Sequence, residues 1–66
     1  MSAQSADILT IFQGGYTVLQ PVSVRGEVWL ERHVEATQRL GTAIPVDNDL
    51  LAPILEGLVR DGLRVA

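Results

Sequence analysis

Residues 16–36 read YTVLQPVSVRGEVWLERHVEA, and this stretch decides the fold. Its first part, residues 16–22, is rich in β-branched and aromatic side chains, which predicts a strand. Pro21 has no amide hydrogen for a sheet ladder, so it predicts either the end of that strand or an edge position. Ser23 is a favourable N-cap, and we expect a helix over residues 24–36. The chain should therefore pass directly from strand into helix.

The expected helix is amphipathic. At the helical period, small, apolar and aromatic side chains gather on its inner side: Gly26, Trp29, Leu30, His33 and Val34. Gly26 on this side predicts a close approach to the sheet. The acids Glu27, Glu31 and Glu35 recur on the other side at a spacing of four residues. They predict a solvated acidic stripe, with Val28 as an apolar side chain beside it.

Upstream, residues 8–12 (ILTIF) are apolar and end at Gly14 and Gly15, a glycine pair that predicts a turn. So short an apolar run is compatible with either a strand or a short helix. We expect residues 1–15 to form a tail with this short apolar segment, and residues 16–66 to form the single folded domain.

Downstream, residues 38–46 resume strand-like content, with Pro45 again at a strand end or edge. The polar run Asp47-Asn48-Asp49 predicts the capped start of a second helix. Apolar residues then recur at helical spacing in the order Leu50, Leu51, Ile54, Leu55, Leu58 and Val59. Pro53 is expected in the first turn of this helix, where a missing amide hydrogen costs little.

Gly62 is expected in the left-handed position that ends the second helix, followed by a short last strand at residues 63–65. The predicted order is strand, helix, strand, helix, strand, with a right-handed crossover in the first unit. The expected fold is a small α/β (α+β) domain in which two helices pack on one face of a three-stranded sheet. The other face, or a strand edge, would stay open to a second copy or a partner.

Composition limits the function classes. The chain has 66 residues, enough for one domain, and it has no cysteine, which excludes disulfides and thiolate metal sites. Five arginines face eight acids, and there is no lysine, so the formal net charge is -3. An acidic domain repels phosphate backbones, and we do not expect nucleic acid as the main partner. The residues that would contact it are Arg25, Arg32 and Arg39.

Catalytic motifs are absent from the sequence. The single histidine, His33, lies on the predicted inner side of the first helix and is interpreted as a packing residue. No serine stands in a nucleophile elbow, and the Asp47 to Asp49 run lacks the rest of a calcium loop. We therefore expect no enzyme activity, no metal and no cofactor. With no basic leader and no long apolar run, we expect a cytoplasmic protein without a membrane span.

Five short motifs carry a resemblance to a family. They are Leu19-Gln-Pro-Val-Ser, Trp29-Leu30-Glu31 with Val34, Gly41-Thr-Ala43, Leu55-Glu-Gly-Leu and Asp61-Gly-Leu-Arg-Val. Together they resemble a group of short uncharacterised proteins of proteobacterial genomes and their prophages. The resemblance covers about residues 16–65 and implies a phage or mobile-element origin, but no catalytic residue. Val28 departs from it, since the family has an acid at this position.

The leading hypothesis is a small non-enzymatic protein-binding module that inhibits a host complex, as anti-CRISPR proteins do. An acidic helix face can occupy an arginine-rich surface of such a complex. The residues expected to bind the partner are Glu27, Val28, Glu31 and Glu35. The alternative is a structural protein that forms a homodimer through the open sheet face and has no inhibitory activity.

Overall fold

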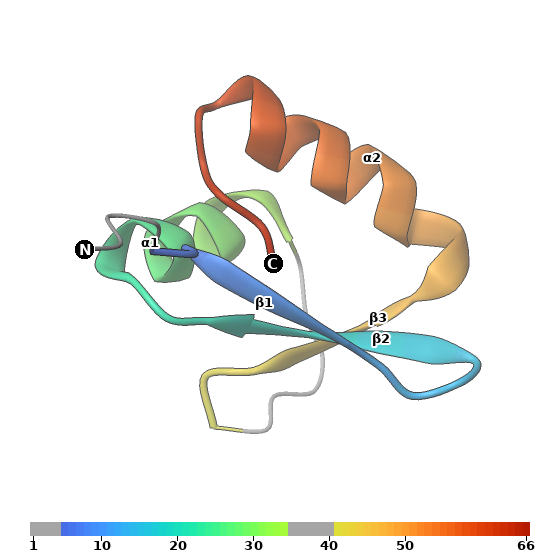
Figure 1. The fold of residues 1–66 in the computed structure, drawn as a ribbon. Helices are drawn as coiled ribbons and strands as arrows, with labels where there is room; N and C mark the ends of the chain where they lie inside the picture. The colour runs from blue at the N-terminus through green and yellow to red at the C-terminus, as the bar shows by residue number, and fades with distance from the viewer. Residues whose placement is uncertain (1–4, 35–40) are drawn as a thin grey trace.

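The computed structural model describes residues 5–34 and 41–66. Its elements are β1 (Ile8–Phe12), β2 (Tyr16–Pro21), α1 (Val24–His33), β3 (Ile44–Asp47) and α2 (Asn48–Arg60). The strands form an antiparallel sheet in the order β1-β2-β3. Both helices lie on the same side of this sheet (Figure 1). The predicted α+β class, with two helices on a three-stranded sheet, is confirmed.

The order of the elements differs from the prediction. The apolar segment of residues 8–12 is a strand, which answers the open choice between strand and helix. It pairs antiparallel with β2 in a hairpin, so the chain begins strand, strand, helix. Since β2 and β3 also pair antiparallel, α1 does not form a right-handed crossover between parallel strands. The predicted crossover was wrong because β3 runs antiparallel to its neighbour β2, whereas a crossover connects parallel strands.

The turn between β1 and β2 contains the predicted glycine pair. Gly14 has a φ of 95°, in the left-handed region where glycine meets no steric penalty. The Gln13 amide donates to the Tyr16 carbonyl over 2.9 Å and closes the hairpin. Asn48, the first residue of α2, donates from its side chain to the Gly14 carbonyl over 2.8 Å. The hairpin turn is thus tied to the start of a helix far along the chain.

The start of α1 follows the prediction, but its end does not. Ser23 has an extended backbone, and its hydroxyl accepts a 3.0 Å hydrogen bond from the Gly26 amide, as an N-cap does. The helix ends at His33, earlier than expected, and Val34 is extended with φ -123° and ψ 116°. From that conformation Val34 packs against the core. Residue Ala36, the predicted end, lies outside the described residues.

The third strand and the second helix also differ in detail. The described part of the predicted strand at residues 38–46 begins with a turn at Gly41, whose φ is 67°, and β3 starts only at Ile44. The Asp47 side chain makes no capping hydrogen bond. Pro53 lies beyond the first turn of α2, contrary to the prediction. Because proline has no amide hydrogen, the backbone carbonyl four residues earlier receives no helical hydrogen bond. This side of the helix is exposed, so water can hydrate that carbonyl.

The end of α2 is a Schellman turn. The Leu63 amide donates to the Leu58 carbonyl over 2.9 Å, and the Gly62 amide donates to the Val59 carbonyl over 3.0 Å. Gly62 has the predicted left-handed backbone, with a φ of 83°. The expected last strand is only one parallel bridge, between Ile8 and Val65. The chain end therefore covers part of the outer edge of β1 without extending the sheet by a full strand.

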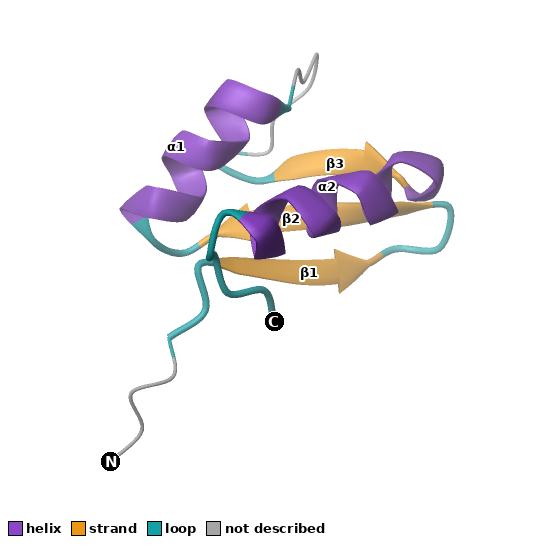
Figure 2. Ribbon diagram, turned by 90° about the horizontal axis from the view of Figure 1, so that it is seen from above, coloured by secondary structure: helices purple, strands orange, loops and turns teal. Residues whose placement is uncertain are grey.

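One apolar core joins the sheet to the helices. It consists of Ile8, Leu19, Trp29, Leu30, Ile44, Val46, Leu51, Leu58 and Leu63. Viewed from above, α2 runs along the sheet while α1 lies near the end of β2 (Figure 2). Gly26 faces the backbone of Asp7, and a Cβ there would collide with the Asp7 carbonyl. The predicted close approach of α1 to the sheet is confirmed at this glycine.

Candidate interaction surface

The outward side of α1 carries an exposed apolar ridge. Val24 is 80% exposed and Val28 is 43% exposed, and their spacing of four residues places them one above the other. The acids Glu27 and Glu31 are both exposed and lie on one flank of this ridge. The structure thus brings together three of the four predicted partner-binding residues. The fourth, Glu35, lies outside the described residues.

The opposite flank of the ridge is basic. Arg25 and Arg32 are exposed on this flank of α1, as the sequence predicted. One Nη of Arg25 donates to the Gly62 carbonyl over 2.8 Å, which connects α1 to the turn after α2. Arg39, the third residue predicted to contact nucleic acid, lies outside the described residues. The exposed surface of α1 is therefore acidic on one side, apolar along the middle and basic on the other side.

Trp29 connects α1 to the end of α2 on the buried side of the helix. Trp29 is 8% exposed, and its indole donates from Nε1 to an Asp61 carboxylate oxygen over 2.7 Å. The His33 ring stacks on it, with centroids 4.2 Å apart and planes at 18°. Because the Trp29 carbonyl can only accept, the Nδ1 of His33, 2.9 Å away, carries the hydrogen. His33 therefore packs on Trp29, as its interpretation as a packing residue expects, but it is exposed and not on the buried side of α1.

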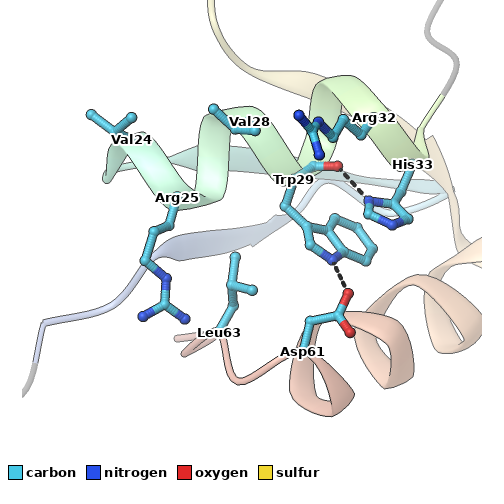
Figure 3. A pocket seen from close by; sticks show the side chains of 8 residues that line it. All are labelled: Val24, Arg25, Val28, Trp29, Arg32, His33, Asp61 and Leu63. Carbon is cyan, nitrogen blue, oxygen red and sulfur yellow. Dashed lines mark hydrogen bonds between the residues drawn. The ribbon is translucent and has the colours of Figure 1, made fainter.

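A shallow groove of about 470 Å³ runs beside α1. Figure 3 shows the side chains that line it: Val24, Arg25, Val28, Trp29, Arg32, His33, Asp61 and Leu63. Six of them come from α1 and two from the turn that ends α2. Two of the three arginines predicted as nucleic-acid contacts, Arg25 and Arg32, line this groove. Asp61 was predicted only as part of a helix end, and no sequence signal pairs it with Trp29.

A carboxylate network fastens the start of α1 to both ends of the chain. Asp7 is 9% exposed and accepts hydrogen bonds from the Ser23 hydroxyl over 2.6 Å and from the Arg64 amide over 2.9 Å. These two hydrogen bonds lower the pKa of Asp7 below its ordinary value, against the opposing effect of burial, with help from the charges of Arg25 and Arg64. The network is structural, and sequence reasoning missed it because its members are far apart in the chain.

The sheet face away from the helices is apolar and open in places. Leu9, Ile11 and Tyr16 are 38%, 42% and 41% exposed, respectively. Cross-strand pairing joins Ile11 to Val18 and Val18 to Pro45, so these side chains share the face opposite the core. This is the uncovered surface that the sequence predicted for a second copy or a partner.

Within residues 5–34 and 41–66, no three histidine, cysteine, aspartate or glutamate side chains are grouped so as to hold a metal ion. No helix formed by these residues is long and apolar enough to cross a membrane.

Comparisons with known proteins give no assignment: no family model, no curated protein and no solved structure matches the chain. The function must be inferred from the surface of α1, the groove beside it and the open sheet face.

Proposed function

We propose that this chain is a non-enzymatic protein-binding module that contacts its partner through the acidic and apolar side of α1. The observation that carries the proposal is the exposure of Val24 and Val28, at 80% and 43%, directly beside Glu27 and Glu31. When a partner covers apolar side chains that are exposed to water in this way, their burial favours binding. The flanking carboxylates favour a partner with a basic surface.

The scaffold beneath this surface supports the same proposal. α1 is held by its Ser23 cap, by the Trp29 to Asp61 hydrogen bond and by Arg25 on the Gly62 carbonyl. A helix fixed at these points loses little conformational freedom on binding, which favours affinity. The exposed side chains thus stand on a rigid support.

As a finer proposal, the partner is a host complex that uses an arginine-rich surface to bind nucleic acid, and the module inhibits it as anti-CRISPR proteins do. The acidic flank of α1 and the family resemblance are its support. The test adds the protein to a purified CRISPR effector complex and measures binding of the target DNA. We expect DNA binding to fall, and we expect Glu27→Lys with Glu31→Lys to restore it.

A matched control is Glu56→Lys, which reverses an exposed acid on α2 and should leave inhibition unchanged. Circular dichroism checks that each variant keeps its helices. If the doubly reversed variant inhibits as well as the wild type does, the acidic flank is not the contact. A plaque assay on cells with active CRISPR immunity tests the inhibitory role in vivo.

The open sheet face favours a second candidate function, self-association. Leu9, Ile11 and Tyr16 expose apolar surface on one side of the sheet. A second copy that packs its own sheet on this face would bury it. Light scattering after size exclusion should then report a dimer, and Ile11→Glu should return it to a monomer. A wild-type monomer across the accessible concentration range would rule this candidate out.

A further inference from the structure

The groove beside α1 combines positive charge with apolar surface. Among its lining residues, Arg25 and Arg32 carry positive charge, whereas Asp61 carries the one negative charge and is hydrogen-bonded to the Trp29 indole. The remaining surface includes Val24, Val28 and Leu63. In a chain with a net charge of -3, this is a local excess of positive charge.

We infer that this groove binds a short acidic segment of another protein, one that carries an apolar side chain beside its carboxylates. The inference goes beyond the proposed function because it uses the basic flank of α1, opposite to Glu27 and Glu31. The two surfaces share only the ridge of Val24 and Val28. Each can therefore be removed by substitution without altering the charges of the other.

The two arginines are positioned for carboxylates. The bond from Arg25 to the Gly62 carbonyl holds its guanidinium beside the groove and leaves other N–H groups free, since a guanidinium has five donors. Arg32 makes no hydrogen bond or ion pair with the residues that the structure describes, and it lines the groove nearer the C-terminal end of α1 than Arg25 does (Figure 3). A guanidinium in this state can receive a carboxylate through paired hydrogen bonds.

The groove suits a peptide better than a nucleic acid. Base recognition beside arginines commonly uses an open aromatic face, but Trp29 is 8% exposed and has His33 stacked on it. A nucleic acid would also bring many phosphates close to Glu27, Glu31 and Asp61. A short acidic segment brings few charges and places its apolar side chain against the valines.

The test begins with a library of random twelve-residue peptides displayed on phage and selected on the immobilised protein. We expect the enriched peptides to combine aspartate or glutamate with leucine or another large apolar residue. One enriched peptide is then synthesised and titrated while the fluorescence of Trp29, the single tryptophan of the chain, is recorded. Its affinity should fall as salt is raised, because the contacts are charged and near the surface.

Arg32→Gln is the decisive variant, since Arg32 makes no hydrogen bond or ion pair with the described residues of the fold. It should lower the affinity for the peptide by about fivefold, which corresponds to the loss of one exposed ion pair. Arg25→Gln should act in the same direction, and the combined variant should weaken binding further. Arg60→Gln, which removes an exposed arginine of α2, should leave the affinity unchanged.

Three results would overturn the inference. The selection could enrich no acidic peptides, or the selected peptide could bind Arg32→Gln as well as it binds the wild type. A twelve-nucleotide oligothymidine could also displace the peptide at equal or lower concentration, which would indicate nucleic acid. Glu27→Lys with Glu31→Lys separates the two proposals, because it should abolish inhibition of the effector complex while the groove still binds the acidic peptide.

Discussion

The Trp29 indole donates a 2.7 Å hydrogen bond to the Asp61 carboxylate, and this contact joins the middle of α1 to the end of α2. Gly57 makes room for it, since a Cβ at that position would lie 3.0 Å from the indole ring. The backbone hydrogen bonds of a helix are made within that helix and do not connect it to a neighbour. Side-chain contacts such as this one therefore hold α1 and α2 in position relative to each other.

Asp61→Ala should destabilise the protein by about 1 kcal/mol. Loss of the acceptor leaves a largely buried N–H unpaired, which costs about 1–3 kcal/mol, whereas removal of an anion from a helix C-terminus returns about 0.3–1 kcal/mol. Urea unfolding followed by circular dichroism measures the net change. In a Trp29→Phe background, which lacks the indole N–H, Asp61→Ala should stabilise the protein slightly, because only the removal of the helix-end charge remains. An equal loss in both backgrounds would show that the hydrogen bond is not the cause.

Gly26→Ala should also destabilise the fold, although alanine is the better helix former. The helical preference is worth about 0.5–1 kcal/mol. The added Cβ would collide with the Asp7 carbonyl, and such overpacking costs about 1–3 kcal/mol. We therefore expect a lower thermal midpoint. Gly15→Ala is the matched control, because nothing lies within 4 Å of its Cβ position, and it should leave the midpoint nearly unchanged.

The Asp7 network predicts a loss of stability in acid. The pKa of Asp7 in the folded protein lies below the ordinary value of 3.8, so the unfolded chain binds the proton more readily. The stabilisation is therefore complete well above pH 3.8 and is lost as the pH falls through the folded pKa. Urea midpoints measured from pH 7 to pH 2 should show this decline. Asp7→Asn should be less stable at pH 7, and its difference from wild type should shrink in acid; a constant difference would contradict the assignment.

The pair Thr17 and Asn48 predicts two unequal substitutions. The Thr17 side chain is fully buried, and its hydroxyl donates to the Asn48 amide oxygen over 2.8 Å. Asn48→Ala leaves the buried hydroxyl without this acceptor and also removes the bond to Gly14, so we expect a loss of about 1–3 kcal/mol. Thr17→Val removes the buried polar group itself, and the exposed Asn48 oxygen can turn to water. It should cost clearly less, and equal losses would show that burial of the hydroxyl is not what matters.

The sequence by itself determined the local features of this protein. The β-branched run before Pro21, the Ser23 cap and the left-handed Gly62 each act within a few residues, so their outcomes follow from backbone sterics and local hydrogen bonds. The alternation of charged and apolar residues likewise predicted the exposed side of α1. The class of fold and three predicted contact residues, Glu27, Val28 and Glu31, follow from such patterns.

Only the tertiary structure decided the pairing of the strands and the construction of the groove. Residues 8–12 form a strand because they pair with β2, whereas residues 63–65 reach only the outer edge of β1 and form one bridge. The bonds from Trp29 to Asp61 and from Arg25 to Gly62 join residues more than thirty positions apart. Contacts at such separations depend on how the helices pack over the core, and no local pattern in the chain encodes them.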